Sequence, residues 1–342
     1  MQKIWLRMKK KGKVLIIYNE PERCEIRNDF EAESSVIDSA LSISECLSEI
    51  GYSCKIIPLS FPLKRFFDIV DEMKPDFIFN LCEGFRGNPK LEMNIAALLE
   101  LLYIPYTGCS AKTLLLAQDK EKAKIIVKKN DILTPEFQTI FCPEDKINID
   151  FPIFLKPPFE DGSIGISEKS YVRNYKEFKI QTKNLIARFG KPVLAEKYID
   201  GREFNVAIFG NKNEIRVLPP AEIVFKDFPS NKAKIVSYEA KWKENTKFYR
   251  NTESHCPAEI PDYISKKLMS LGRKIYKIFE ADSYARVDFR LNAKEEIYFL
   301  EFNPNPDISP NAGFRKALLA ANIDFASFAE LLLKISKWRR RR

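Results

Sequence analysis

Short apolar runs and stretches with helical periodicity alternate along the first hundred residues. The expected elements are strands at 14–18, 54–58 and 76–80 and helices at 31–50, 63–73 and 90–102. The helices should end at Gly51, before Pro75 and before Pro105, because glycine and proline punctuate helices. Strands that alternate with helices in this way predict a parallel sheet with helices on its faces.

Beyond residue 110 the pattern predicts more strands than helices. Two short helices are expected within 110–130, Pro135 opens a new strand region, and Phe151–Lys156 is an apolar strand that ends in a lysine. The remaining expected elements are strands at 193–198, 203–209, 214–218, 220–225, 284–291 and 296–303 and helices at 258–279, 312–321 and 324–337. Residues 226–250 are polar and should form a long ordered loop, a feature that often acts as a lid.

The composition is that of an ordered globular protein. Hydrophobic residues make up 45% and charged residues 30% of the 342 residues, a length that usually forms two or three folding units. No apolar run reaches the roughly 18 residues of a membrane span, and the N-terminus has no apolar signal core. The sequence therefore predicts a cytoplasmic protein that has no membrane partner.

The net charge of +9 comes from the two ends of the chain. Residues 1–13 carry six basic and no acidic residues, residues 339–342 are four arginines, and the body between them sums to −1. A nucleic-acid-binding face normally enriches the body in Lys and Arg as well. We therefore interpret the ends as solvated tails and do not expect nucleic acid as a partner.

The cysteines and the single histidine exclude several kinds of site. Seven cysteines are present, no pair has CxxC spacing, and His255 is the one histidine. A disulfide framework, a zinc centre and a Ser–His–Asp hydrolase are therefore not expected. Any catalysis should depend on carboxylates, lysines, arginines and a bound metal ion.

Charged and apolar residues alternate in the strands expected at 284–291 and 296–303. Side chains alternate faces along a strand, so Arg286, Asp288 and Arg290 share one face, as do Glu301 and Asn303. A hairpin would bring Asp288, Glu301 and Asn303 together, a set of hard oxygen ligands suited to Mg²⁺. The alternative is the polar outer face of an ordinary hairpin. The two prolines that follow Asn303 favour a site, because they make a rigid loop at the strand end.

Two weaker signals point to a nucleotide. Lys156 can face an anion from the end of an apolar strand, and Gly162–Gly165 can offer backbone N–H groups to phosphates. This segment is neither a Walker A loop nor a GxGxxG motif, and an ordinary hairpin turn is the alternative. Glu196 and Glu203, seven residues apart across Gly201, could accept hydrogen bonds from an adenine amine or a ribose hydroxyl; surface charge is the alternative.

Together these segments resemble the ATP-grasp fold and, within it, the D-alanine–D-alanine ligase family. The resemblance runs from about Asp76 to Lys337 and rests on stretches in register at 99–108, 119–120, 155–157, 196–203, 238–241, 286–288 and 300–303. It implies an α/β protein with an N-terminal parallel α/β domain at 1–108, followed by two α+β subdomains that clamp ATP. The central subdomain is expected at 109–192, and the C-terminal one, with the metal site and the basic tail, at 193–342.

The resemblance also implies a role for each matching residue. The implied nucleotide ligands are Lys120 and Lys156 on the phosphates, with Lys156 also near the adenine, Glu196 at the adenine amine, Lys197, Tyr198 and Ile199 around the purine, Glu203 at the ribose and Lys241 at the γ-phosphate. Asp288, Glu301 and Asn303 would hold two Mg²⁺ ions, for which Mn²⁺ can substitute. Arg286 would stabilise the oxyanion of the tetrahedral intermediate.

In this family a carboxylate attacks the γ-phosphate of ATP to give an acyl phosphate, and an amine then displaces the phosphate to form an amide. Such chemistry depends on positioning and on cations, so histidine is dispensable. The loop at 226–245 would keep water from the acyl phosphate. The implied function is an ATP-dependent, ADP-forming carboxylate–amine ligase. A non-catalytic ATP-binding regulatory module is the alternative, and three retained metal ligands argue against it.

The substrate end departs from the family pattern. Trp242 stands where the family usually has a tyrosine, and Gly162, with Ser163 beside it, stands where the family has a serine that contacts substrate. The segment 305–313 replaces a small glycine turn: it includes Asp307 and places Ala312 and Gly313 at a Ser–Leu pair that holds the second substrate's carboxylate. The expected acceptor pocket is therefore altered.

The residues expected to contact the first substrate also differ from the family pattern. Residues 80–84 replace a histidine–glycine substrate loop, and the N-terminal glutamate that contacts the first amino acid is either Glu31 or Glu33. The expected substrates are amino acids or small peptides, which need not be two D-alanines. The family often dimerises, so the resemblance also implies a homodimer.

Overall fold

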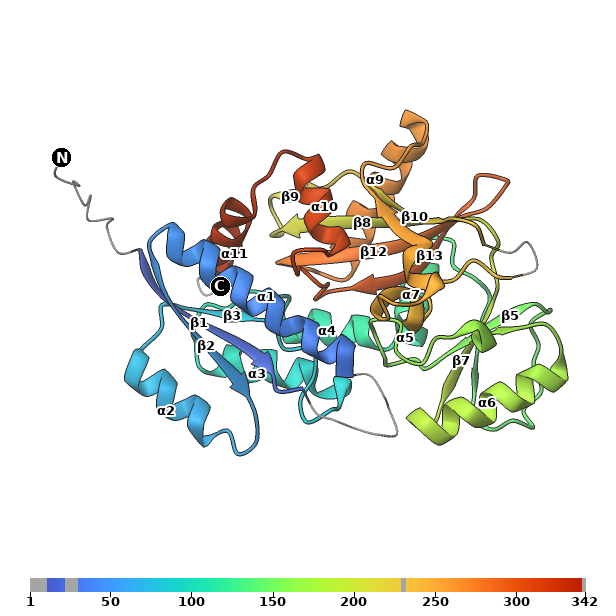
Figure 1. Cartoon of the computed structure of the whole chain (residues 1–342), viewed down its shortest axis with the longest axis horizontal. Coiled ribbons are helices and arrows are strands. Elements are labelled where there is room, and N and C mark those ends of the chain that lie inside the picture. Colours follow the sequence, from blue (N-terminus) through green and yellow to red (C-terminus); the bar gives the residue numbers. More distant parts are fainter. Residues whose placement is uncertain (1–10, 22–29, 229–231, 340–342) are drawn as a thin grey trace.

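The computed structural model describes residues 11–21, 30–228 and 232–339, which form three sheets with helices around them (Figure 1). The N-terminal sheet has the order β2-β1-β3, and all its neighbours are parallel. Its strands are β1 (Gly12–Asn19), β2 (Tyr52–Leu59) and β3 (Phe77–Asn80). The parallel sheet predicted from βαβ alternation is confirmed.

Helices cover both faces of this sheet, because successive residues of β1 point to opposite faces and are apolar on each. Val14 and Ile16 pack in one core with α1 (Phe30–Glu49) and α11 (Phe325–Arg339), at opposite ends of the chain. The other face packs against α2 (Lys64–Met73), α3 (Glu92–Leu101), which follows a 3-10 turn at Pro89–Leu91, and α4 (Ala111–Gln118). The C-terminal helix thus completes the N-terminal unit.

The central sheet is antiparallel and has the order β4-β7-β5-β6. Its strands are β4 (Phe137–Ile140), β5 (Ile153–Lys156), β6 (Tyr171–Val172) and β7 (Val193–Lys197); α5 (Lys120–Lys128) precedes them, and a 3-10 turn at Glu168–Ser170 leads into β6. Strand β7 pairs within this sheet, although the sequence analysis placed residue 193 at the start of the next unit. Helix α6 (Tyr175–Phe189) is missing from the sequence-based prediction; Asn174 accepts from the Glu177 N–H at its start, and Gly190 (φ 78°) ends it.

The C-terminal sheet has the order β11-β10-β8-β12-β13, and β9 pairs with β8. Its strands are β8 (Arg202–Gly210), β9 (Ile215–Val217), β10 (Ala221–Phe225), β11 (Thr252–His255), β12 (Tyr284–Leu291) and β13 (Ile297–Asn303). Helix α9 (Asp262–Ile278) buries the apolar face, and the short helix α10 (Gly313–Ala320) follows β13. The edge strand β11 is a further element that the pattern did not predict.

A β-bulge shapes the predicted hairpin. Asp288 pairs with Glu301, but the next residue, Phe289, pairs with Phe299, so Leu300 is an extra residue in β13. As a result Phe299 and Phe302 are both buried in the core, although they are three positions apart in the strand. Without this bulge the alternation of faces would place one of the two phenylalanines on the polar face.

The polar segment predicted as a loop is partly helical. It contains α7 (Tyr238–Trp242) and α8 (Lys247–Arg250), each capped by a hydroxyl side chain, that of Ser237 or Thr246. The prediction of a long ordered loop over 226–250 was therefore wrong where these two helices form. The basic ends at 1–10 and 340–342 lie outside the described residues.

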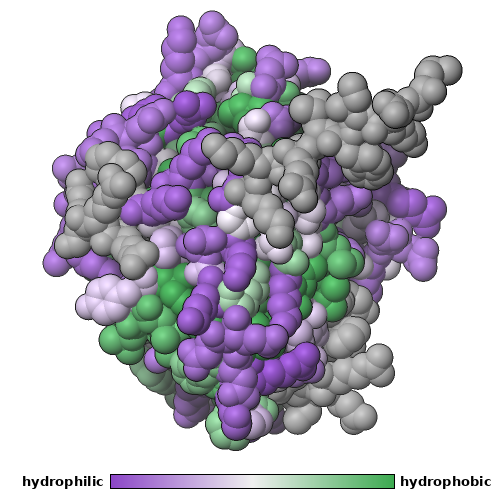
Figure 2. All heavy atoms as spheres, turned by 90° about the vertical axis from the view of Figure 1, so that its left-hand side faces the viewer, coloured by the Kyte–Doolittle hydropathy of each residue, from purple (hydrophilic) through white to green (hydrophobic). Residues whose placement is uncertain are grey.

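The surface of the described chain is mixed in character. Seen from the side of the N-terminal unit, it is largely hydrophilic, and hydrophobic side chains gather on its lower half (Figure 2). Across the described ranges, no helix combines the length and the apolar character needed to cross a membrane.

Candidate active site

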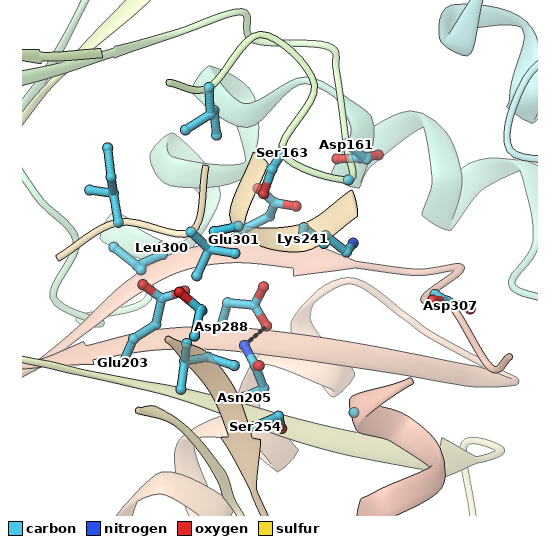
Figure 3. A pocket seen from close by; sticks show the side chains of 18 of the residues that line it. Asp161, Ser163, Glu203, Asn205, Lys241, Ser254, Asp288, Leu300, Glu301 and Asp307 are labelled. Carbon is cyan, nitrogen blue, oxygen red and sulfur yellow. Dashed lines mark hydrogen bonds between the residues drawn. The ribbon is translucent and has the colours of Figure 1, made fainter. Parts of the chain in front are cut away.

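A cavity of about 1030 Å³ is lined by both the central and the C-terminal sheet. It brings together most of the residues singled out in the sequence. Those that line it are Lys156, Gly162, Ser163, Glu196, Lys197, Tyr198, Ile199, Glu203, Lys241, Trp242, Arg286, Asp288, Glu301, Asp307 and Ala312. In Figure 3, Glu203, Asp288 and Glu301 surround one part of the cavity, and Asp307 lies farther along it.

Two predicted residues, Asn303 and Lys120, fall outside this lining. Asn303 lines an adjoining cavity of about 70 Å³, together with Lys241 and Arg286. Lys120 is buried, and its ammonium donates to Asp161 Oδ1 and to the Glu160 carbonyl, both at 2.7 Å. Lys120 therefore contacts residues 159–165, the segment that contains Gly162 and Gly165 and is here called the glycine loop. The side chains of Glu31 and Glu33 lie outside the described part of the chain.

The register of β12 and β13 sets the geometry of the oxygen donors. Asp288 lies opposite Glu301, and Arg286 lies opposite Asn303, so the four polar side chains form two adjacent cross-strand pairs. Lys120 Nζ lies 3.7 Å from Glu301 Oε2, and the backbone N–H of Asn305 donates to Asn303 Oδ1 at 2.9 Å. The hairpin convergence predicted from alternation is therefore present.

Asp288 is held by two neighbours. Arg286 donates to both carboxylate oxygens, from Nε to Oδ1 at 2.7 Å and from Nη2 to Oδ2 at 2.8 Å. Asn205 Nδ2 donates to Oδ1 at 2.7 Å (Figure 3). The sequence analysis did not single out Asn205. The available signal was its place on β8, two residues after Glu203 and therefore on the same face.

Glu196 forms the centre of a buried charge cluster. Its Oε1 lies 2.8 Å from Lys156 Nζ and 3.1 Å from Lys124 Nζ. Burial alone would raise the pKa of Glu196, but the two ammonium groups outweigh it and lower that pKa. Burial lowers the pKa of Lys124 to about 8, although the Glu196 carboxylate opposes the shift. Glu196 is therefore ionised near neutral pH.

The sequence analysis missed Lys124. It follows Lys120 by four residues on α5, so both side chains lie on the same helix face. In the sequence this spacing is the only signal, and it is equally typical of a solvent-exposed charged face.

Glu203 is a third carboxylate that lines the cavity, together with Asp288 and Glu301. Its Oε2 is 3.3 Å from Arg290 Nη1, and burial raises the pKa of Glu203 although Arg290 opposes the shift. Arg290 also donates to the Lys234 carbonyl at 2.7 Å and lies over the Tyr198 ring, 5.6 Å from its centroid. Arg290 thus fixes Glu203 beside the segment expected to hold the purine.

The segment that carries Lys241 is fastened to the glycine loop. Trp242 Nε1 donates to the Gly162 carbonyl at 2.8 Å, and the Tyr238 N–H donates to the Ile166 carbonyl at 3.0 Å. The Lys241 ammonium lies 4.7 Å from the centroid of the Trp242 ring. Burial, and to a lesser extent Arg286, lowers the pKa of Lys241. The α7 segment and the glycine loop, which both line the cavity, therefore meet at Trp242 and Gly162.

The part of the cavity where the sequence analysis expects the acceptor is lined by residues of helix α10 and strand β11. Ala312 precedes α10 and gives no side-chain cap to its first turn. Ser254 of β11 lines the same part of the cavity, and a Cβ placed on Gly313 would lie 3.5 Å from Ser254 Oγ. Asp307 Oδ1 accepts from the Ser309 N–H at 2.8 Å, which orders the loop before α10.

These residues make the cavity suitable for a polyphosphate beside a carboxylate-rich wall. Lys156 of β5, Lys241 of α7 and Arg286 of β12 line it from three elements, and Asp288 and Glu301 supply hard oxygen donors. Within the described residues, no group of three or more His, Cys, Asp or Glu side chains has the spacing of a metal site. Any divalent ion here would therefore need the Asn303 amide or oxygens of a ligand in addition to the two carboxylates.

Comparisons with known proteins agree with this geometry. A family model described as D-ala D-ala ligase C-terminus matches residues 125–334. A D-alanine–D-alanine ligase of Carboxydothermus hydrogenoformans is 31% identical over 272 residues, which is 76% of this chain and 81% of that protein. The D-alanine–D-alanine ligase of Aquifex aeolicus is 28% identical, over 85% of this chain and 92% of its own length.

A solved structure has the same fold. The D-alanine–D-alanine ligase of Bacillus anthracis, complexed with ATP, superposes with a TM-score of 0.73 at 20% identity, over 96% of this chain and 99% of that one. The ATP-grasp fold expected from the sequence is confirmed.

Proposed function

The chain belongs to the D-alanine–D-alanine ligase family, and on that premise we propose that it is an ATP-dependent, ADP-forming ligase that joins an amino-acid carboxylate to an amine. One observation carries the proposal: Arg286, Asp288 and Glu301 lie on two paired strands and line one cavity with Lys156 and Lys241. The alternative, a non-catalytic ATP-binding module, is not favoured, because the named relatives are ligases.

We propose that Asp288, Glu301 and Asn303 hold two Mg²⁺ ions, for which Mn²⁺ can substitute. The donor set fits, since two carboxylates and one amide oxygen from paired strands are hard ligands that leave coordination places for phosphate oxygens. When bound, the ions would neutralise charge on the transferred phosphoryl group.

The protein's own residues would position and shield the reactants. Lys156 and Lys120 would bind the phosphates of ATP, with Lys120 first releasing Asp161, and Lys241 would approach the γ-phosphate. Glu196, Glu203 and the backbone of Lys197–Ile199 would hold the base and the ribose. Arg286 would donate to the oxyanion that forms when the amine attacks the acyl phosphate. Binding and orientation account for most of such catalysis.

The cover formed by α7 and the glycine loop would exclude water. An acyl phosphate is lost to hydrolysis if water reaches it, so a closed cover favours attack by the amine. Trp242 fastens this cover through Gly162, in place of the tyrosine and serine that the family pattern predicts at these positions.

The proposed substrates are amino acids, as the names of the relatives suggest, or small peptides. The acceptor end departs from the family pattern at Asp307, Ala312 and Gly313, so the acceptor need not be D-alanine. Glu31 or Glu33 is the proposed contact for the first amino acid.

A homodimer and a cytoplasmic location are further parts of the proposal. The N-terminal unit exposes large hydrophobic side chains, such as Phe61 (68%), Leu101 (76%) and Tyr103 (76%), which would suit a contact between two copies. Sedimentation velocity of the protein and of Leu101→Glu tests the dimer, and cell fractionation tests the location.

The division into three units also stays a proposal. The boundaries are those expected at 108 and 192, with the second moved to the end of β7 because β7 pairs in the central sheet. Limited proteolysis followed by mass measurement would locate the boundaries.

The experiment that tests the function measures ADP release. The protein is incubated with ATP, Mg²⁺ and a panel of amino acids and dipeptides, singly and in pairs, and products are identified by mass. The proposal expects ADP release that depends on both a carboxylate and an amine and yields a product with the mass of the amide. ATP binding without amine-dependent turnover would favour the non-catalytic module instead.

A further inference from the structure

Lys124 is a fully buried lysine that no step of the proposed reaction uses. Its ammonium has three N–H donors and meets three oxygen acceptors: Thr134 Oγ1 at 3.1 Å, the Leu300 carbonyl at 3.2 Å and Glu196 Oε1 at 3.1 Å. A buried ammonium is tolerated only when it is paired in this way. The three acceptors come from the segment before β4, from β13 and from β7, so the position of Lys124 is fixed from three sides.

Glu196 receives a second ammonium on the same oxygen. Lys156 Nζ lies 2.8 Å from Oε1, the atom that Lys124 also approaches. The carboxylate is only 3% exposed, yet it lines the cavity beside Lys156, Tyr198 and Leu300. Both ammonium groups approach Glu196 most closely at Oε1, so the carboxylate lies between the two lysines and the cavity that it lines. Lys124 itself does not line the cavity, so it acts on a ligand only through Glu196 or Leu300.

We propose that Lys124 is a positioning residue for base recognition: it holds Glu196 as an oriented carboxylate that selects a purine with an amine at position 6. The inference rests on the proposed function, which places Glu196 at the adenine amine. A fixed carboxylate accepts a hydrogen bond from the 6-amine of adenine and repels the 6-carbonyl of guanine. Without Lys124, Glu196 keeps one ion pair, loses its fixed orientation, and discriminates less between the two bases.

A purely structural role is the competing explanation. Through the Leu300 carbonyl, Lys124 also joins α5 to the bulge of β13. A structural tie alone would lower the thermal stability when removed, and it would weaken ATP and GTP equally. The ratio of the two affinities therefore separates the explanations, whereas stability does not.

The test measures binding of the non-hydrolysable β,γ-imido analogues of ATP and GTP by calorimetry, on the full chain with Mg²⁺. Lys124→Met removes the charge and keeps the length of the side chain. We expect the ATP analogue to bind about tenfold more weakly and the GTP analogue to change by less than about threefold, so that the preference for ATP falls. Lys122→Met is the matched control, because Lys122 is on the same helix and its side chain is 69% exposed; both affinities should stay at the wild-type values.

A milder variant covers the case in which Lys124→Met does not fold. Thr134→Val removes one acceptor and leaves the charge, and it should lower the preference for ATP in the same direction by about threefold. An unchanged ATP-to-GTP ratio in the variants that fold would overturn the proposal. The proposed ligase function is tested separately: if the wild-type protein binds the ATP analogue selectively but forms no amide, the function fails while this inference stands.

Discussion

Arg286 and Asp288, two residues apart on β12, form an ion pair with two parallel hydrogen bonds of 2.7 and 2.8 Å. Burial alone would lower the pKa of Arg286, but Asp288, together with Glu301 and Asp307, outweighs burial and raises that pKa, so the guanidinium stays charged. Both oxygens of Asp288 are in use. Any cation that binds Asp288 must share or replace Arg286, and a displaced Arg286 becomes available to an oxyanion. The pair therefore links metal binding to the residue expected to stabilise the reaction.

Asp288→Asn should abolish turnover and leave the fold intact. The amide keeps the shape of the side chain and removes the charge that would bind a cation, so we expect the kcat for ADP release to fall by at least about 100-fold. The measurement is a coupled ADP assay together with thermal unfolding. Asp262→Asn, an exposed carboxylate on α9, is the control and should behave as wild type. A normal kcat in Asp288→Asn would remove Asp288 from the ligand set.

Trp242→Phe should loosen the cover of the cavity. The substitution keeps an aromatic ring and removes the N–H that donates to the Gly162 carbonyl. One such hydrogen bond contributes about 0.5–1.5 kcal/mol, which predicts a loss of about three- to tenfold in kcat for amide formation. More ADP should also be released per amide formed, because water would reach the acyl phosphate. The ADP-to-amide ratio is the diagnostic quantity, and a ratio equal to that of wild type would mean that Trp242 does not fasten the cover.

Nucleotide affinity should fall as the pH rises through about 8. The pKa of Lys124 is lowered to about 8 because burial outweighs Glu196, with Lys156 adding to the lowering and Glu301 opposing it. Between pH 7 and 9 Lys124 loses its proton, and Glu196 keeps only the Lys156 ion pair. We therefore expect the KM for ATP to rise over this interval.

Stability should respond to the same pH change in the opposite direction. A lysine whose pKa is lower in the folded state than in the unfolded state destabilises the fold while it is charged, so stability rises with pH between about 8 and the unfolded value near 10.4. The KM for ATP should therefore rise without a fall in thermal stability attributable to Lys124. Lys124→Met should lack the inflection in KM, and an identical profile in that variant would assign the titration to another group.

Part of this site could be predicted from the sequence. Alternation of charged and apolar residues places Arg286 and Asp288 on one face, and the hairpin turn brings Glu301 and Asn303 opposite them, because strand geometry depends on local sequence alone. The same alternation fails at Leu300. The bulge there serves the packing of Phe299 and Phe302 against α9 and its neighbours, and such packing involves residues far apart in the chain.

Other features depend on contacts that a local pattern does not contain. Lys124 looks like surface charge until β7 and β13 bury it, and Lys120 meets Asp161 because the glycine loop folds back over α5. Helix α7 lies in a polar segment and packs on the glycine loop through Trp242, so its apolar face is too short to give a periodic signal. The site was therefore predictable where one strand or hairpin defines it, and not where separate sheets meet.

Asn303→Ala should weaken metal binding more than it weakens nucleotide binding. Asn303 lines the small cavity beside Arg286, and its Oδ1 already accepts from the Asn305 N–H, which leaves one lone pair of the amide oxygen for a cation. Mn²⁺ reports on this directly, since free Mn²⁺ is measured by electron paramagnetic resonance in the presence of the non-hydrolysable ATP analogue. We expect the affinity for Mn²⁺ to fall about tenfold, with the affinity for the nucleotide alone unchanged within about twofold. Asn205→Ala is a second probe, because Asn205 donates to Asp288 without lying opposite Glu301; it should change Mn²⁺ affinity less than Asn303→Ala does. If chelation of divalent ions leaves ADP release intact, or if Asn303→Ala binds Mn²⁺ as wild type does, then the hairpin does not hold the metal, and Asn303 serves to order the loop that follows it.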